Sequence, residues 1–141
     1  MVNKPEIFDN TMIIPSDASL LADVDEFIES RLEAANVAAS LIADVAISVT
    51  EIVNNAIAHG NKNDQNKTIT VAVRFDGDQV EISVKDEGHG FNPDSIPSPI
   101  EEPNLLNQVG RGIFIVRSLM DSVDFRFTDL GTEVILKKKI K

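Results

Sequence analysis

Residues 48–60, SVTEIVNNAIAHG, combine two patterns on one helix. Apolar residues recur at spacings of three and four through residues 37–59, which predicts an amphipathic helix with one face on a hydrophobic core. The same spacing gathers four polar side chains on another face: Ser48, Glu51, Asn55 and His59. Taken alone, such a stripe is typical of a solvated helix face. An acid and an amide one turn apart can also divide a chemical task, because a carboxylate accepts a proton and an amide oxygen binds a hard cation.

The segments on either side of this helix predict a single α+β domain over residues 1–141. Upstream, a helix over residues 18–35 begins after Ser16 as its N-cap, and Gly60 ends the central helix as a C′ glycine. Alternating apolar residues predict an edge strand and two hairpins, with a third helix between the hairpins. The strands are residues 6–14, 68–75 with 80–84, and 123–128 with 132–139, and the third helix is residues 112–120. Helices early and hairpins late predict a two-layer sandwich, with three helices covering a mixed, mostly antiparallel sheet.

Charge and cysteine content exclude several classes of function. The 141 residues carry a formal net charge of −10, so the chain is a poor ligand for a nucleic-acid backbone and no direct DNA binding is expected. Any bound nucleotide must then be held by local backbone N–H groups, a metal ion or single basic side chains. The absence of cysteine excludes disulfides and a thiol nucleophile, and it fits a reducing cytoplasm. We expect neither a signal peptide nor a membrane span, because no uncharged apolar stretch reaches about 20 residues.

Two glycine-containing segments flank the long loop of residues 86–110, and a loop of this length is usually functional. The first, Asp86-Glu87-Gly88-His89-Gly90-Phe91, directly follows an apolar strand. Its glycines allow the backbone to approach a ligand, and the acid can accept a hydrogen bond from an exocyclic amine such as that of adenine. The second, Gly110-Arg111-Gly112, is predicted to open the third helix, where free N–H groups, the helix dipole and a guanidinium suit phosphate. Each segment alone is also typical of an ordinary turn or loop.

In this order and spacing, the segments resemble the boxes of the GHKL (histidine-kinase-like) ATPase superfamily, whose ATP-binding domain has the Bergerat fold. Glu51-x-x-x-Asn55-Ala56 with His59-Gly60 resembles the N-box, and Asp86-x-Gly88-x-Gly90-Phe91 resembles the G1 box. Gly110-Arg111-Gly112 resembles the G2 box, and Gly131-Thr132 resembles the final glycine-threonine motif. The string GRGIFIVRSLMD at residues 110–121 and the short lid are similar to those of the anti-sigma-factor serine kinases.

The resemblance implies a role for each matching residue. Glu51 would be the general base, and Asn55 would hold Mg²⁺ against the phosphates of ATP. Asp86 would bind the adenine amine, supported by Thr132, while Gly88, Gly90 and Phe91 would pass close to the base. Residues 92–109 would form the ATP lid, and Gly110, Arg111 and Gly112 would contact the phosphates.

The function implied is an ATP-dependent protein serine/threonine kinase that is also an anti-sigma factor. It would phosphorylate a small anti-anti-sigma (STAS) protein and sequester a sigma factor in the cytoplasm. An alternative is an ATP-binding module that captures a partner without phosphotransfer, in which Glu51 would be dispensable. A third hypothesis is a detached catalytic domain that serves a histidine phosphotransfer protein. A homodimer through the first helix is also expected, with Leu20, Leu21, Val24, Phe27 and Ile28 serving an interface as well as a core.

Overall fold

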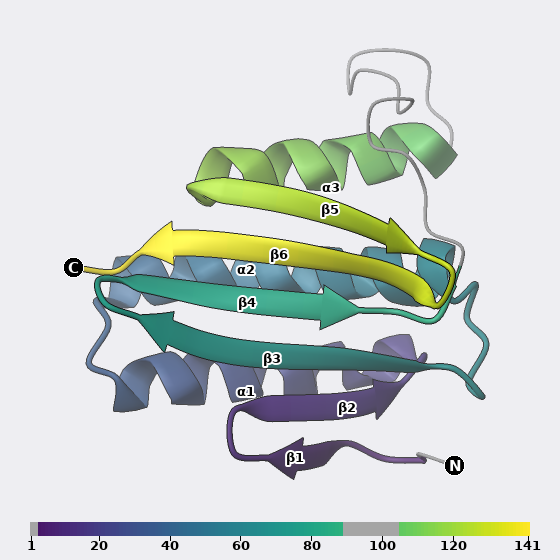
Figure 1. Cartoon of the computed structure of the whole chain (residues 1–141), viewed down its shortest axis with the longest axis horizontal. Helices are drawn as coiled ribbons and strands as arrows, with labels where there is room; N and C mark the ends of the chain where they lie inside the picture. The colour runs from purple at the N-terminus through teal and green to yellow at the C-terminus, as the bar shows by residue number, and fades with distance from the viewer. Residues whose placement is uncertain (1–2, 89–104) are drawn as a thin grey trace.

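The computed structural model of the chain describes residues 3–88 and 105–141, with side chains described for all of these except residues 105–109. Within these residues, six antiparallel strands form one sheet in the order β1-β2-β3-β4-β6-β5 (Figure 1). The strands are β1 (Glu6–Phe8), β2 (Thr11–Pro15), β3 (Thr68–Asp76), β4 (Gln79–Lys85), β5 (Ser122–Thr128) and β6 (Gly131–Lys139). Both predicted hairpins are confirmed, and the predicted edge strand is itself a hairpin of β1 and β2.

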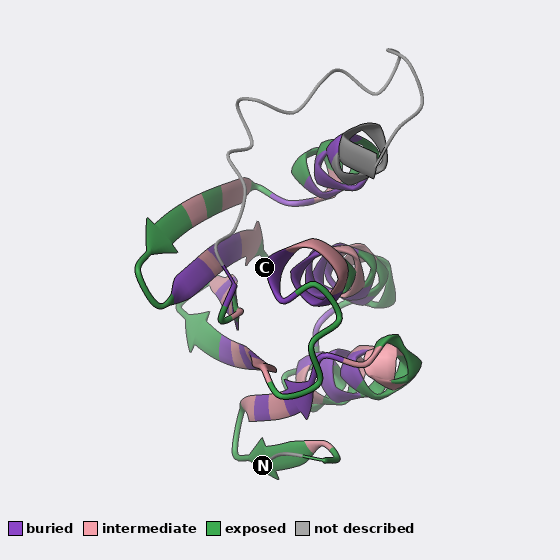
Figure 2. Ribbon diagram, turned by 90° about the vertical axis from the view of Figure 1, so that its right-hand side faces the viewer, coloured by how far each residue is buried: buried purple, intermediate pink, exposed green. Residues whose placement is uncertain are grey.

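Three helices in the described segments cover one face of the sheet and leave the other face open (Figures 1 and 2). They are α1 (Leu21–Ala34), α2 (Ala39–Asn55) and α3 (Leu105–Leu119). A short 3-10 turn, Ala18–Leu20, precedes α1, and a π-helical segment, Ala56–Gly60, continues α2. The central helix α2 packs against both α1 and α3. The predicted α+β two-layer architecture is therefore confirmed, and every strand pairing among the described residues is antiparallel.

One hydrophobic core fills the space between the two layers. Its members come from the inward faces of the central strands and from α1 and α2, and they include Ile14, Ile28, Val49, Ile69, Ile82 and Leu136. The helical stretch Ala39–Gly60 is long and apolar enough to cross a membrane by length and composition alone. More than half of it is buried inside the domain, which is the usual position of a core helix in a soluble protein.

Three expectations about element ends are wrong in detail. Ser16 is not an N-cap: it is buried and donates to the Lys67 carbonyl oxygen, while Asp17 accepts from the backbone N–H of Ser19. Gly60 lies inside the π-helical segment with no left-handed backbone, so it does not end the helix as a C′ glycine. The third helix begins at Leu105 rather than at Gly112. In α1, Val24, Phe27 and Ile28 belong to the core, as expected, and the dimer interface stays a prediction.

Candidate functional site

Glu51 and Asn55 of α2 face Gly112 of α3. A Cβ atom on residue 112 would stand 2.9 Å from Oε2 of Glu51 and 3.6 Å from Nδ2 of Asn55. Glycine is therefore the residue that lets α3 lie this close to the two polar side chains of α2. Two segments that are about sixty residues apart in the sequence are brought together here, as the sequence motifs predicted.

The polar stripe of α2 is not a solvated face. Ser48 is fully buried and donates to the Asp44 carbonyl oxygen, and Asn55 is only 6% exposed. Glu51 and His59 are half-buried. Burial lowers the pKa of His59 below its usual value, which keeps its imidazole neutral at neutral pH. The interpretation of this stripe as a solvated helix face is therefore wrong for Ser48 and Asn55.

Two buried polar atoms near Asp86 have no hydrogen-bond partner among the described residues. They are Nδ2 of Asn55 and Oγ1 of Thr132. Both residues line the same small cavity between α2 and the sheet, together with Asp86, Val84 and Phe125. Buried polar groups without partners are rare in folded proteins, and each one costs about 1–3 kcal/mol. Two that line one cavity make it a candidate site for a polar ligand.

This cavity measures only about 10 Å³, close to the space that one water molecule needs. An aromatic base therefore enters only when the side chains around the cavity move apart. The cavity walls carry the residue types that such a ligand requires. Apolar side chains from β4 and β6 can cover the faces of a ring, and polar groups at one end can bind its edge.

Asp86 lies immediately after β4, held by the adjacent strand β6. Its backbone N–H donates to the Thr132 carbonyl oxygen at 2.9 Å, and its Oδ1 accepts from the N–H groups of Thr132 at 3.1 Å and Gly88 at 3.0 Å. Burial raises the pKa of Asp86 above its usual value, and those two N–H groups oppose the rise. The carboxyl group is thus fixed through one oxygen, and its Oδ2 lies where a Cβ on Gly60 would collide with it.

Three glycines let backbone segments touch around Asp86. A Cβ on Gly60 would collide with the Asp86 carboxylate, one on Gly88 with the Gly60 carbonyl group, and one on Gly131 with the Asp86 carbonyl group. Gly131 also has a φ of +147°, which disfavours other residues. Gly60, Gly88 and Gly131 are thus places of close approach within the protein, and the expected approach of Gly88 to a ligand stays a prediction.

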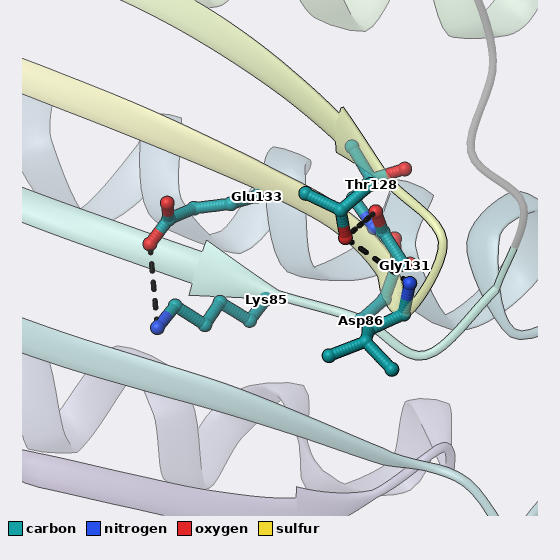
Figure 3. Close-up of a pocket in the computed structure, with 7 residues that line it drawn as sticks. Lys85, Asp86, Thr128, Gly131 and Glu133 are labelled. Carbon is teal, nitrogen blue, oxygen red and sulfur yellow. Dashed lines mark hydrogen bonds and ion pairs between the residues drawn. The ribbon is translucent and has the colours of Figure 1, made fainter.

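Asp86 also borders a second hollow of about 260 Å³, at the turn of the β5–β6 hairpin (Figure 3). Lys85 and Glu133 form an ion pair of 3.5 Å beside it, and Thr128 accepts from Leu130 and donates to Gly131 within the turn. Lys85 and Glu133 belong to the open face of the sheet, opposite the helices, since Val84 and Val134 point into the core. This hollow is larger than the cavity beside Asn55, but neither Glu51 nor Asn55 lines it.

A third hollow opens beside Glu51, on the outer side of the helices. It measures about 350 Å³ and lies between α1 and α2, lined by Leu21, Ala22, Asp25, Ile47, Thr50 and Glu51. Glu51 therefore borders both this hollow and the contact with Gly112. A group that approaches from outside can reach its carboxylate without crossing the core.

Part of the predicted site lies elsewhere or outside the described residues. Gly90, Phe91 and residues 92–104 of the expected lid lie outside them, and the last residues of that lid, 105–109, are helical. Gly110, Arg111 and Gly112 lie inside α3, so their N–H groups belong to the helical hydrogen-bond ladder rather than to a free helix N-terminus. Arg111 is exposed. The prediction that these residues open the helix is wrong for this conformation.

Sequence reasoning missed Asn61, a buried residue that links α2 to the turn after β4. Its Oδ1 accepts from the N–H of Glu87 at 2.8 Å. The signal in the sequence is a polar residue directly after His59-Gly60, but the run of polar residues 61–67 predicts only a loop.

A cavity between a sheet and its helices, lined by apolar side chains and a few convergent polar groups, is typical of a small-molecule binding domain. Residues 14–138 match the family described as histidine kinase-like ATPase domain. An anti-sigma F factor of Clostridium perfringens is 32% identical over 103 residues, which are 70% of this chain and 73% of that protein. A serine-protein kinase RsbW of Listeria innocua is 30% identical over 105 residues, which are 70% of this chain and 66% of that protein. The chain belongs to the histidine kinase-like ATPase domain family.

Solved structures agree with this fold. The RsbU and RsbW domains of Rv1364c from Mycobacterium tuberculosis superpose with a TM-score of 0.68 at 21% identity. The match covers 92% of this chain, which spans about a third (32%) of that longer chain. A blue-light activated histidine kinase of Erythrobacter litoralis EL346 gives a TM-score of 0.56 over 74% of this chain at 21% identity. At these identities the likeness supports the fold alone, and the fold and family predicted from the sequence are confirmed.

Proposed function

We propose that this chain is an ATP-dependent protein serine/threonine kinase of the anti-sigma-factor type. It transfers the γ-phosphate of ATP to a serine or threonine of a small STAS-type antagonist protein, and it sequesters a sigma factor when that antagonist is phosphorylated. The names of its relatives, anti-sigma F factor and serine-protein kinase, support this function. We place it in the cytoplasm, where a sigma factor would be its partner.

The proposal that the chain binds ATP rests on two buried polar atoms near Asp86 that have no hydrogen-bond partner among the described residues. Nδ2 of Asn55 and Oγ1 of Thr132 are buried beside one cavity, whose remaining walls are Asp86 and apolar side chains. Adenine has an apolar face and a polar edge, so it satisfies both kinds of wall. We assign the exocyclic amine of the base to the Asp86 carboxylate, whose Oδ1 is already held by two backbone N–H groups.

The residues present also fit a magnesium ion at the phosphate end. Magnesium takes few ligands from the protein and the rest from phosphates and water, so one amide oxygen is a sufficient contribution. No group of three or more acidic, histidine or cysteine side chains suited to a metal occurs in the described segments. Because the nitrogen and oxygen of an amide exchange places by a flip, Asn55 can present its oxygen there. Bound Mg²⁺ neutralises the charge of the phosphates.

We assign to Glu51 the role of general base for the acceptor hydroxyl group. It borders the hollow of about 350 Å³ between α1 and α2, through which an acceptor side chain can reach it. The acceptor hydroxyl oxygen forms the new bond to the γ-phosphorus, the bond from that phosphorus to the ADP oxygen breaks, and Glu51 takes the hydroxyl proton. A positioned general base of this kind contributes about 10²–10⁴-fold to the rate.

Gly110, Arg111 and Gly112 remain our candidates for phosphate contacts, with Gly88, Gly90 and Phe91 beside the base. Free backbone N–H groups at Gly110 require that the first turn of α3 unwind, because that helix now begins at Leu105. We therefore expect nucleotide binding to shorten α3 from its N-terminus. A homodimer also remains part of the proposal, but with an interface outside the buried stripe of α1. Sedimentation that gives a monomer at high concentration would exclude it.

The experiment incubates the protein with γ-labelled Mg-ATP and each small STAS-domain protein of the same genome, and it measures ATP binding in parallel. Glu51→Ala is compared with wild type and with Glu33→Ala, a matched loss of an exposed acid on α1. We expect label on a serine or threonine of one acceptor, loss of at least 100-fold in rate for Glu51→Ala only, and unchanged ATP binding in both variants.

The other outcomes separate the alternatives. Tight ATP binding with no transfer to any acceptor would favour the binding module, in which Glu51 has no role. Acid-labile phosphohistidine on a partner would favour the domain that serves a histidine phosphotransfer protein. No ATP binding at all would overturn the assignment of the cavity around Asp86.

A further inference from the structure

Asn61 is the most completely hydrogen-bonded buried side chain near the site. It is 1% exposed, and its amide makes three bonds to three separate segments. Its Nδ2 donates to Oγ of Ser16 at 2.9 Å and to the Thr68 carbonyl oxygen at 3.0 Å, and its Oδ1 accepts from the Glu87 N–H at 2.8 Å. Both hydrogens of the amide nitrogen are therefore used.

The position of Asn61 in the chain links the two ends of the candidate site. Its backbone N–H donates to the Ala56 carbonyl oxygen at 2.7 Å, which closes the π-helical segment that follows Asn55. Its side chain holds Glu87, the residue directly after Asp86. One residue thus joins the helix end that carries the proposed metal ligand to the turn that carries the proposed adenine-binding acid.

These two segments lie in direct contact, with the Asp86 carboxylate packed against Gly60. Gly60 and Gly88 meet backbone to backbone, and a Cβ on Gly88 would stand 3.1 Å from the N atom of Asn61. This contact limits how near the turn can come to the end of the helix, but glycines have no side chain that would keep the turn from moving away. Asp86 at the start of the turn is bonded to Thr132 of β6. The next residue, Glu87, adds two directional contacts: its N–H donates to Oδ1 of Asn61, and its Oε2 accepts from the Thr68 N–H at 2.6 Å.

We propose that Asn61 is a positioning residue of the nucleotide site, which sets the separation of Asp86 from Asn55 and thereby the selectivity for adenine over other bases. This inference rests on the proposed ATP binding. A fully satisfied buried polar network fixes one arrangement of the segments that it joins, because any shift leaves a buried group unpaired. A shift of the turn moves the Asp86 carboxylate relative to the base but leaves the phosphate end unchanged.

The test measures dissociation constants for Mg-ATP, Mg-GTP and inorganic tripolyphosphate with magnesium, together with thermal stability. In Asn61→Ala we expect ATP affinity to fall at least 10-fold, the ratio of ATP to GTP affinity to fall with it, and tripolyphosphate affinity to change less than 2-fold. Ser16→Ala is the matched control, because it removes one partner of the same amide but leaves the bond to Glu87. It should lower stability and keep the ATP to GTP ratio within 2-fold.

Asn61→Asp provides the rescue, since a carboxylate keeps an oxygen for the Glu87 N–H while losing the two donated bonds. We expect it to lose stability and to keep most of the adenine selectivity. If Asn61→Ala is unfolded at the assay temperature, Asn61→Ser gives the same comparison, because its hydroxyl is too short to reach Glu87. Equal losses for ATP, GTP and tripolyphosphate, or an unchanged ratio in a folded variant, would overturn the inference. A wild type that binds none of the three probes would instead overturn the proposed function.

Discussion

Gly112 of α3 lies against Glu51 of α2, with room for a hydrogen atom but not for a methyl group. A Cβ at residue 112 would stand 2.9 Å from Oε2 of Glu51, closer than a carbon and an oxygen atom pack without one of them moving. The oxygen is the far end of a flexible side chain, so the fold can accommodate the methyl group. The position of the carboxylate cannot stay the same.

Gly112→Ala is therefore expected to separate activity from stability. The methyl group displaces the Glu51 carboxylate by a few tenths of an ångström, and we expect at least a roughly 10-fold loss of phosphotransfer rate. Stability should rise or stay unchanged, because replacing glycine by alanine inside a helix gains about 1 kcal/mol. Ser118→Ala is a control on the exposed part of the same helix and should leave the rate unchanged. An unaltered rate in Gly112→Ala would contradict the role of Glu51 as base.

Asn55→Ala is expected to abolish Mg-ATP binding without lowering the melting temperature. The variant removes a buried amide nitrogen that has no partner in the described part of the chain, and it improves helix propensity. Calorimetric titration with Mg-ATP and a thermal melt measure the two effects. Asn54→Ala is the matched control, since Asn54 is its exposed neighbour on the same helix. A melting temperature that falls by more than about 4 °C, or roughly 1 kcal/mol, would show that Asn55 serves the fold instead.

The sequence alone predicted the layers and the strands but not how the site closes. Alternating apolar residues predict the strands β3, β4, β5 and β6, because each strand has one face on the core and its side chains point alternately to the two faces. The four motifs also predicted which segments meet, since Glu51, Asn55 and Gly112 do lie together. The order of motifs in a sequence does not show how closely their segments pack. The contact between Gly60 and the Asp86 carboxylate was therefore not predicted.

Helix ends were the weakest part of the sequence-based predictions, for a physical reason. Gly60 was expected to end α2, yet it is glycine because the Asp86 side chain occupies the place of its Cβ. Gly110 and Gly112 were expected to open α3, yet both lie within it, where neither needs a positive φ. Glycine marks a helix end only when conformation requires it, and the same residue type serves close packing equally well. Asn61 was missed because its partners are brought together only by the tertiary fold.

Gly60→Ala and Gly88→Ala should differ although both fill the same small gap. The methyl group of Gly60→Ala meets the Asp86 side chain, which can rotate away, so we expect a loss of ATP affinity of at least 10-fold with a modest loss of stability. The methyl group of Gly88→Ala meets the Gly60 carbonyl group, which cannot move unless the end of the helix moves with it. We expect it to be destabilised by about 1–3 kcal/mol, the usual cost of overpacking. Urea titrations and ATP binding rank the two variants, and equal stability losses would contradict the assignment of these contacts.

Asp86→Asn tests the electrostatics of the site through both stability and binding. Burial raises the pKa of Asp86 in the folded protein above the value of 3.8 that an unperturbed aspartate has. Between 3.8 and that raised pKa the folded state binds more protons than the unfolded state. The free energy of unfolding therefore decreases as the pH rises through this window, and the loss persists at neutral pH. Asp86→Asn removes the charge, so it should be the more stable protein at pH 7 and lose that advantage below pH 3.8.

ATP binding should respond in the opposite direction, because the adenine amine needs the ionised carboxylate as its acceptor. We expect Asp86→Asn to bind ATP about 10–100-fold more weakly at pH 7, the size of one charge-assisted hydrogen bond. In wild type, affinity should begin to fall at a higher pH than for an ordinary aspartate. The ratio of the wild-type and variant affinities across the pH range cancels the titration of the nucleotide itself. A ratio close to one at every pH would show that Asp86 does not bind the base, whereas a ratio that is large at pH 7 and falls toward one at lower pH locates the pKa of Asp86 in the functioning site.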